Sequence, residues 1–242
     1  MNNQKYMKGT QPKTENVKQM FDNIAPTYDS LNHILSLSID KIWRRRVVRT
    51  VRRLGAKRIL DVATGTGDLA IAMARRISGS MICGVDLSPQ MLEVARTKVA
   101  KRGFDERITL MEGNAEHLEL ADQSVDAVTI AFGIRNFENK EACLQELRRI
   151  IRKDGHLVIL EFSNPTNRLI SCLYRLYSHK ILPWIGGLIS KDRSAYEYLP
   201  NSVDGFPNPD AFSQIIESAG FRMVSRRSQS FGIAQIYTAQ KI

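Results

Sequence analysis

The amino-acid sequence predicts an α/β fold, in which a largely parallel, doubly wound sheet is covered by helices on both faces. Two observations predict this class. Short apolar, β-prone runs alternate with segments of helical periodicity through the centre of the chain, a pattern typical of parallel sheets. A glycine-rich turn also joins the first of these runs to the helix that follows it. With 242 residues, 43% of them hydrophobic, the chain can bury a full core as a single domain.

The N-terminal part of the chain divides into a tail and a helical region. Residues 1–16 are polar and lack the apolar core of a signal peptide, so we expect a flexible tail. Residues 17–242 are expected to form the single domain, and residues 17–57 its N-terminal helical lid. Within them, Pro26 ends a stretch whose apolar residues follow helical spacing.

A polar and aromatic cluster follows Pro26. One interpretation is the exposed surface of a helix packed on the domain, and the other is a lid over a pocket. Packing explains such a cluster poorly, which favours the lid, although an isolated histidine is more often a surface residue than a catalyst. The cluster consists of Tyr28, Asp29, Asn32 and His33.

The segment from residue 43 to 58 is strongly basic and holds eight of the 35 Lys and Arg residues. Val47, Val51 and Leu54 form an apolar stripe at helical spacing, so most of the arginines must face solvent, and Gly55 fits a helix C-cap. A solvated helix face, contact with lipid head groups and contact with nucleic acid all fit this pattern. The net charge of +10 does not choose among them.

The central region supplies the predicted sheet. Because parallel strands end at the same edge, residues that follow them should meet around one crevice. Asp86 ends the second strand, 112–116 follow the third and 131–136 follow the fourth. The predicted strands are 58–62, 81–86, 107–111, 125–131 and 156–162, and the predicted helices between them are 68–77, 89–102 and 139–151.

The glycine-rich turn follows the first strand. Its backbone N–H groups, at the start of a helix, suit an anionic group. Gly65 and Gly67 followed by Ala70 also fit a dinucleotide fingerprint, with Asp86 at the place of a ribose-binding acid, so an NAD oxidoreductase is an alternative. Asp61 lies within the strand, where its carboxylate is expected to brace the loop or face a cationic ligand.

Residues 61–68, with Asp86 and the pair Asn114 and Ala115, resemble a class I S-adenosylmethionine-dependent methyltransferase. A closer resemblance, covering about residues 15–241, is to the demethylmenaquinone and ubiquinone C-methyltransferase family. The segments that carry it are 28–36 with Trp43, 131–136, 149–163, 196–202, 206–207 and 231–234. The sequence departs from the family pattern at Asp40, Ala131 and Asp154, where many members have His, Ser and Gly.

The resemblance implies a Rossmann-like fold with a seven-stranded, mostly parallel sheet and an antiparallel last strand. The sixth strand would be 221–227 and the seventh 235–239. Residues 164–205 would be an insertion that covers the acceptor site, and its apolar stretch is too interrupted to span a membrane.

The implied cofactor is S-adenosylmethionine, and no metal is expected. The loop N–H groups would take the methionine carboxylate, Asp86 the ribose hydroxyls, and Asn114 with the Ala115 backbone the adenine. The positions concerned are Thr64, Gly65, Asp86, Asn114 and Ala115.

The implied reaction methylates a carbon of a polyprenylated quinol. A quinol ring becomes nucleophilic when it loses a hydroxyl proton, so a cation beside the forming phenolate would help. Arg135 is the expected cation, Asn136 would orient the oxygen, and Tyr28 or a water would relay the proton. Demethylmenaquinol is the first choice of substrate and a ubiquinone precursor the other.

The expected setting is the cytoplasm, because the three cysteines are far apart and form no disulfide or zinc pattern. Peripheral contact with an anionic membrane at its inner face is a further expectation. No nucleic-acid partner is expected, and a homodimer is one alternative for the oligomeric state. The alternative functions are methylation of RNA or of another small molecule, and a non-catalytic cofactor-binding protein.

Overall fold

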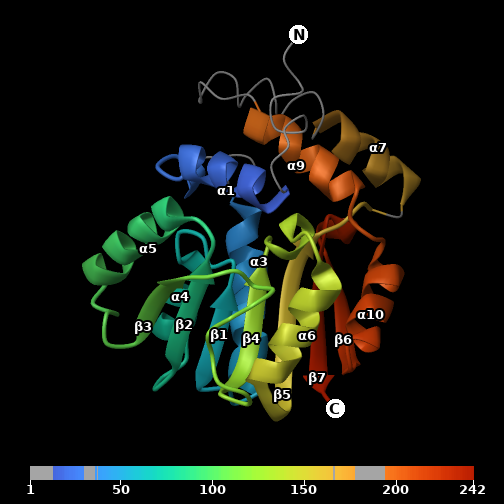
Figure 1. Cartoon of the computed structure of the whole chain (residues 1–242). Coiled ribbons are helices and arrows are strands. Elements are labelled where there is room, and N and C mark those ends of the chain that lie inside the picture. The colour runs from blue at the N-terminus through green and yellow to red at the C-terminus, as the bar shows by residue number, and fades with distance from the viewer. Residues whose placement is uncertain (1–12, 30–35, 37, 166, 178–193) are drawn as a thin grey trace.

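The computed structural model describes residues 13–29, 36, 38–165, 167–177 and 194–242. Its centre is a single sheet of seven strands in the order β3-β2-β1-β4-β5-β7-β6 (Figure 1). The strands are β1 (Arg58–Val62), β2 (Met81–Asp86), β3 (Ile108–Glu112), β4 (Val125–Ala131), β5 (Ile151–Phe162), β6 (Phe221–Gln229) and β7 (Ala234–Lys241).

The topology confirms the predicted fold class. β1 pairs in parallel with both β2 and β4, and β7 runs antiparallel to both β5 and β6. The parallel strands therefore end along one edge of the sheet, the upper edge in Figure 1. Three helices lie over this edge: α1 (Lys13–Ile24), α7 (Arg168–Leu176) and α9 (Ser194–Asp204).

Helices cover both faces of the sheet because its central strands are apolar on both. Leu60 and Val62 of β1 belong to the core with α6 and α10, whereas Ile59, on the opposite face, belongs to the core with α3 and α4. Figure 1 shows α6 and α10 in front of the sheet and α3 and α4 behind it. These helices, with α5, are α3 (Ile39–Arg53), α4 (Asp68–Arg76), α5 (Pro89–Lys101), α6 (Lys140–Ile150) and α10 (Pro209–Ser218).

Most predicted boundaries hold to within two residues, but β5 begins at Ile151 and not at residue 156. The run Arg152 to Gly155 suggests a turn, yet it is part of the strand and lies at an irregularity in the pairing with β4, between the pairs Val125–Ile151 and Ala127–His156. Asp154 adopts a left-handed φ of 60° here, a conformation that aspartate tolerates better than most residues. Aspartate can therefore stand where many family members have glycine without changing the local backbone conformation.

The structure describes only part of the predicted tail, lid and insertion. α1 starts at Lys13, so residues 13–16 are helical where the sequence suggested tail. The rest of that tail, Asn32 and His33 of the lid cluster, and residues 178–193 of the insertion lie outside the described residues. Within the residues that the structure describes, no helix is both long and apolar enough to cross a membrane.

Candidate active site

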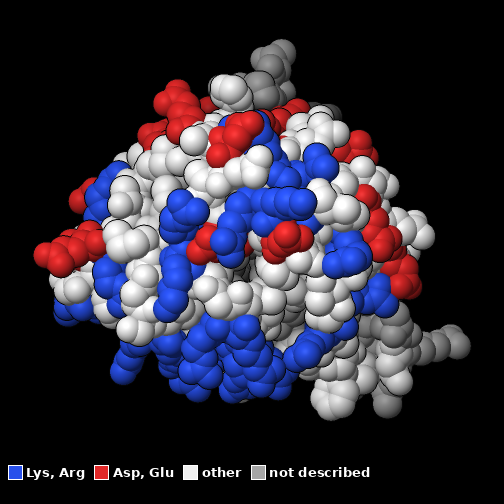
Figure 2. Space-filling model, turned by 90° about the horizontal axis from the view of Figure 1, so that it is seen from below, with Lys and Arg blue, Asp and Glu red and all other residues white. Residues whose placement is uncertain are grey.

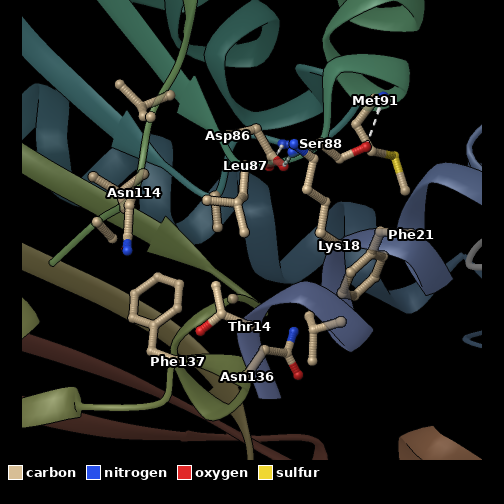
Figure 3. A pocket seen from close by; sticks show the side chains of 18 of the residues that line it. Thr14, Lys18, Phe21, Asp86, Leu87, Ser88, Met91, Asn114, Asn136 and Phe137 are labelled. Carbon is tan, nitrogen blue, oxygen red and sulfur yellow. Dashed lines mark hydrogen bonds between the residues drawn. The ribbon is translucent and has the colours of Figure 1, made fainter. Parts of the chain in front are cut away.

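A cleft opens at the carboxyl ends of β1, β2, β3 and β4, beneath α1 (Figure 3). Its empty space, counted out to the open mouth, is about 810 Å³. Six of the predicted cofactor and catalytic residues line it: Tyr28, Gly65, Asp86, Asn114, Ala115 and Asn136. Sequence positions far apart therefore meet at one site, as the strand ends predicted.

The glycine loop is braced from below. Asp61 is 1% exposed, and its two carboxylate oxygens accept hydrogen bonds from Thr64 Oγ1 at 2.7 Å and Thr129 Oγ1 at 2.6 Å. Burial raises the pKa of Asp61 to about 6, although the two threonine hydroxyls and nearby Arg44 lower it. Thr64 thus lies under the loop and does not line the cleft, so its side chain fixes the loop and the loop approaches the ligand.

The loop N–H groups have partners within the protein. Thr64 donates its N–H to Val85 O at 3.0 Å, and Gly67 donates to Thr64 O at 3.0 Å. Gly65 donates to Asp86 Oδ2 at 2.7 Å. These three groups are therefore engaged in the structure, which differs from the expected open cradle for a methionine carboxylate.

Asp86 joins the loop to the end of β2. Besides Gly65, its other oxygen accepts the N–H of Ser88 at 3.0 Å, at the N-cap of α5. Burial raises the pKa of Asp86, while these backbone N–H groups lower it. Each carboxylate oxygen still has a second lone pair to offer a ligand hydroxyl. The geometry therefore suits the predicted ribose contact.

Asn114 lies across the cleft from Asp86, in the loop after β3. Its Oδ1 accepts the N–H of Glu116 at 3.0 Å, so the amide nitrogen is directed into the cleft (Figure 3). Leu87 adds an apolar wall between Asn114 and Asp86, whereas Met91 lies beyond Asp86 (Figure 3). A nitrogen donor beside an apolar surface suits the acceptor atoms and the flat face of a purine.

α1 closes the cleft and is attached on two sides. Lys18 Nζ lies 3.0 Å from Glu112 Oε1 at the end of β3. Thr14 Oγ1 donates to Glu138 Oε2 at 2.8 Å, beyond β4. Lys18 also lines the cleft and was not identified from the sequence, where it is one polar residue on an amphipathic helix.

The segment after α1 is attached separately, through a cluster of four residues. We call this cluster the lysine latch, and it consists of Asp29, Thr66, Asp68 and Lys98. Lys98 Nζ contacts Asp29 Oδ2 at 2.5 Å and Asp68 Oδ1 at 2.6 Å. Thr66 Oγ1 donates to Asp29 Oδ1 at 2.5 Å. The latch therefore joins the predicted lid directly to the glycine loop.

Arg135 is buried behind the cleft and does not line it. Its Nη1 lies 2.8 Å from Oε1 of Glu161 on β5, and its guanidinium stacks 5.4 Å from the centre of the Phe162 ring. Nη1 also donates to Phe132 O, and Nε donates to Ser202 Oγ at 3.3 Å. Neither Glu161 nor Ser202 was selected as a site residue from the sequence.

Asn136, the next residue of the short helix η1 (Ile134–Asn136), enters the cleft instead. Its Oδ1 accepts a hydrogen bond from the hydroxyl of Tyr198, on α9, at 3.0 Å. Burial raises the pKa of Tyr198, and Arg135 lowers it. The predicted insertion, residues 164–205, therefore contacts a residue of the cleft through the Tyr198 hydroxyl.

The sheet order, the antiparallel β7 and the cleft at the carboxyl ends of the parallel strands define the Rossmann-like fold of the class I methyltransferases. A solved S-adenosylmethionine-dependent methyltransferase from Aquifex aeolicus has the same fold. Its TM-score is 0.59 at 17% identity, covering 81% of this chain and 89% of its own.

Sequence relatives narrow the class to a family. The profile of the ubiE/COQ5 methyltransferase family matches residues 9–241, and the chain belongs to this family. It is 44% identical over 229 residues to the demethylmenaquinone methyltransferase of Bacteroides fragilis, covering 95% of this chain and 94% of the relative. It is 46% identical to a ubiquinone/menaquinone biosynthesis C-methyltransferase of Syntrophotalea carbinolica, covering 93% of each. The dinucleotide interpretation of the glycine loop is therefore dropped.

Proposed function

We propose that this methyltransferase transfers the methyl group of S-adenosylmethionine to a ring carbon of a polyprenylated quinol. Demethylmenaquinol is the first choice, since that substrate appears in the name of the Bacteroides fragilis relative. A ubiquinone precursor is the second, because the Syntrophotalea carbinolica relative carries both names. The observation that carries the proposal is this similarity over nearly the whole chain.

Different residues of the cleft suit the ribose and the adenine of the cofactor. Asp86 would accept hydrogen bonds from the ribose hydroxyls, and Asn114 would donate to the adenine beside Leu87. When bound, the cofactor supplies an electrophilic methyl group on a sulfonium. α1 and the lysine latch would hold the lid closed and exclude water from that methyl group.

The acceptor must lose a proton to become a good carbon nucleophile. For a phenol with a pKa near 10, ionisation at pH 7 costs about 4 kcal/mol, at about 1.4 kcal/mol per pH unit. Asn136 is the polar group at the place in the cleft where the phenol oxygen would lie, and Tyr198 fixes its amide. Tyr28, also in the cleft, would pass the proton to solvent.

Arg135 would stabilise the phenolate from behind Asn136. Its charge is shared with Glu161, so it acts as part of an ion pair and supplies less field than an isolated guanidinium would. The pair also fixes η1, and with it the position of Asn136. These two roles, electrostatic and positional, predict different effects of substitution on the pH dependence of activity.

The test is a methylation assay with labelled S-adenosylmethionine and both quinols in detergent micelles. Label should enter the ring of demethylmenaquinol, with the ubiquinone precursor compared at the same concentration. Asp86→Ala is the matched inactive control. Label that enters RNA in preference to either quinol would contradict the proposal and support the alternative reaction.

A polyprenylated substrate lies in a bilayer, so the enzyme should work at a membrane surface. We propose peripheral association at the cytoplasmic face, with the basic helix α3 close to anionic lipid. Each suitably placed Lys or Arg contributes about 1 kcal/mol to such contact. The exposed arginines of α3 support this proposal.

A further inference from the structure

A groove runs between α3 and the edge strand β6 on the flank of the molecule. Three arginines of α3 line one side of it, and residues at the end of β6 line the other. They are Arg46, Arg49, Arg53, Arg227, Ser228 and Gln229. Arg46 Nη1 donates to Gln229 Oε1 across the groove, which fixes the distance between its walls.

The groove concentrates positive charge. Arg49, Arg53 and Arg227 are exposed, and no carboxylate pairs with any of them within the described part of the chain. Seen from the edge of the sheet opposite the cofactor cleft, Lys and Arg side chains gather into a broad area along one margin (Figure 2). Four guanidinium groups around one depression, with the Ser228 hydroxyl, form a recognition surface for phosphate oxygens.

One end of the groove adjoins apolar side chains, where the first turns of α3 meet the turn after β6. Phe231 is 80% exposed although it is a large aromatic residue, and it adopts a left-handed φ of 60°. Ile42, 47% exposed, stands one helical turn before Arg46 on α3. Trp43 Nε1 donates to Ser230 Oγ at 3.1 Å, so the start of α3 lies against the turn that carries Phe231.

Phe231 is costly in this position, since neither its burial nor its backbone conformation stabilises the fold. A non-glycine residue with positive φ is strained, and an exposed phenyl ring gains nothing from packing. The next residue, Gly232, packs against Pro165, where the segment that covers the acceptor side begins. The apolar end of the groove is therefore next to the part of the enzyme that a lipid-soluble substrate must reach.

We propose that this arginine groove binds the phosphates of anionic phospholipids while Phe231 and Ile42 enter the acyl region. The inference rests on the proposed function for its purpose, delivery of a quinol from the bilayer, but its geometry is independent of the reaction. Phospholipid is favoured over RNA because Phe231, whose ring could stack on a base, is accompanied by the aliphatic Ile42, which could not, whereas both side chains suit the acyl region of a bilayer.

The test is sedimentation of the full chain with vesicles of phosphatidylcholine alone and with phosphatidylglycerol added. Anionic vesicles should bind at least about tenfold more tightly than neutral ones, and salt should reverse the binding. Arg49→Glu with Arg227→Glu should remove this preference. The matched control is Arg76→Glu with Lys101→Glu, which makes the same charge change at exposed residues of α4 and α5.

The apolar end has its own test. Phe231→Asn places a residue that tolerates left-handed φ, so it should keep or raise the unfolding temperature while vesicle affinity falls at least about threefold. In every variant, S-adenosylmethionine affinity and methylation of a short-chain quinol in detergent should stay within twofold of wild type, which separates this proposal from the reaction itself.

Three outcomes would overturn the proposal. Equal binding to neutral and anionic vesicles removes the phosphate contact. An equal loss in the groove and control variants shows a general effect of charge, without a specific groove. The groove would belong to a soluble anion if inorganic phosphate or a short RNA binds the wild type tightly and the groove variant weakly, while the groove variant binds vesicles as the wild type does.

Discussion

Arg135 and Glu161 form a buried pair with two contacts: Nη1 lies 2.8 Å from Oε1, and the Arg135 backbone N–H donates to Oε2 at 3.2 Å. Glu161 also accepts the N–H of Phe162 at 2.9 Å, and its side chain is fully buried. The carboxylate therefore holds both the side chain and the backbone of η1. Since Asn136 ends this helix, the pair determines where the amide enters the cleft.

Asp86→Ala should weaken S-adenosylmethionine binding by roughly 2 to 3 kcal/mol, because a charged hydrogen-bond acceptor is lost. The variant also leaves the Gly65 N–H without its partner, which loosens the loop. Calorimetric titration measures the change. Asp105→Ala, at an exposed carboxylate outside the cleft, should bind the cofactor as the wild type does. Equal affinities of the Asp86 and Asp105 variants would remove the ribose contact.

The lysine latch should control the lid. In Lys98→Met, Asp29 and Asp68 lose their common cation and repel each other. Hydrogen exchange in residues 13–29 should accelerate, and cofactor affinity should fall about tenfold, the effect of about 1.4 kcal/mol. Lys101→Met, three residues along α5, is the control. If the exchange of residues 13–29 is the same in both variants, the latch does not hold the lid.

Asp61 should make folding stability depend on pH. Its pKa is raised from 3.8 to about 6, mainly by burial, so between these values the folded chain binds more protons than the unfolded chain. Stability therefore falls as pH rises through this interval, by up to about 3 kcal/mol at about 1.4 kcal/mol per pH unit.

Asp61→Asn keeps the shape of the side chain and removes its ionisation, and the threonine hydroxyls can turn to pair with the amide. The difference in unfolding free energy between this variant and the wild type should therefore shift in favour of the variant from pH 4 to pH 7. Urea unfolding at several pH values measures it. A constant difference across the range would show that Asp61 does not titrate there.

The strands and the cofactor side of the cleft could be predicted because they depend on local pattern. The apolar run of β1 and the acid at the end of β2 each have a signature in the sequence, and parallel pairing brings them together. The direction of Arg135 has no such signature. Phe132 adopts a left-handed φ of 63°, and that turn aims Arg135 at Glu161, 26 positions later on β5.

Only one wall of the arginine groove could be predicted from the sequence, for the same reason. The basic face of α3 follows from helical spacing, but its opposite wall is formed by residues more than 180 positions away, as the pair Arg46 and Gln229 shows. Sequence spacing cannot indicate which face of a helix meets an edge strand. The sheet order, with β6 outside β7, decides it.

The last prediction separates the two roles of Arg135. If its charge stabilises the phenolate from behind Asn136, Arg135→Ala should lower kcat with cofactor affinity nearly unchanged, but by less than the factor of about 10² to 10³ usual for a donor that contacts the oxyanion, because Glu161 shares its charge. Arg135→Lys should recover only part, because a point charge does not reproduce the planar guanidinium. The rise of activity with pH should also move to higher pH in the alanine variant, since the quinol then ionises less readily.

Glu161→Gln should move the pH profile in the opposite direction from Arg135→Ala, so the two variants together separate the roles. It removes the negative partner and keeps a hydrogen-bond acceptor, so the field of Arg135 at the cleft increases and the activity rise should move to lower pH. If Arg135 only positions η1, both variants lose kcat and neither moves the pH profile. Breaking a buried pair typically costs about 3 to 5 kcal/mol, so thermal unfolding and cofactor titration must first show that each variant is folded. Unchanged kcat and pH profile in folded Arg135→Ala would leave Asn136 and Tyr28 as the groups that act on the quinol.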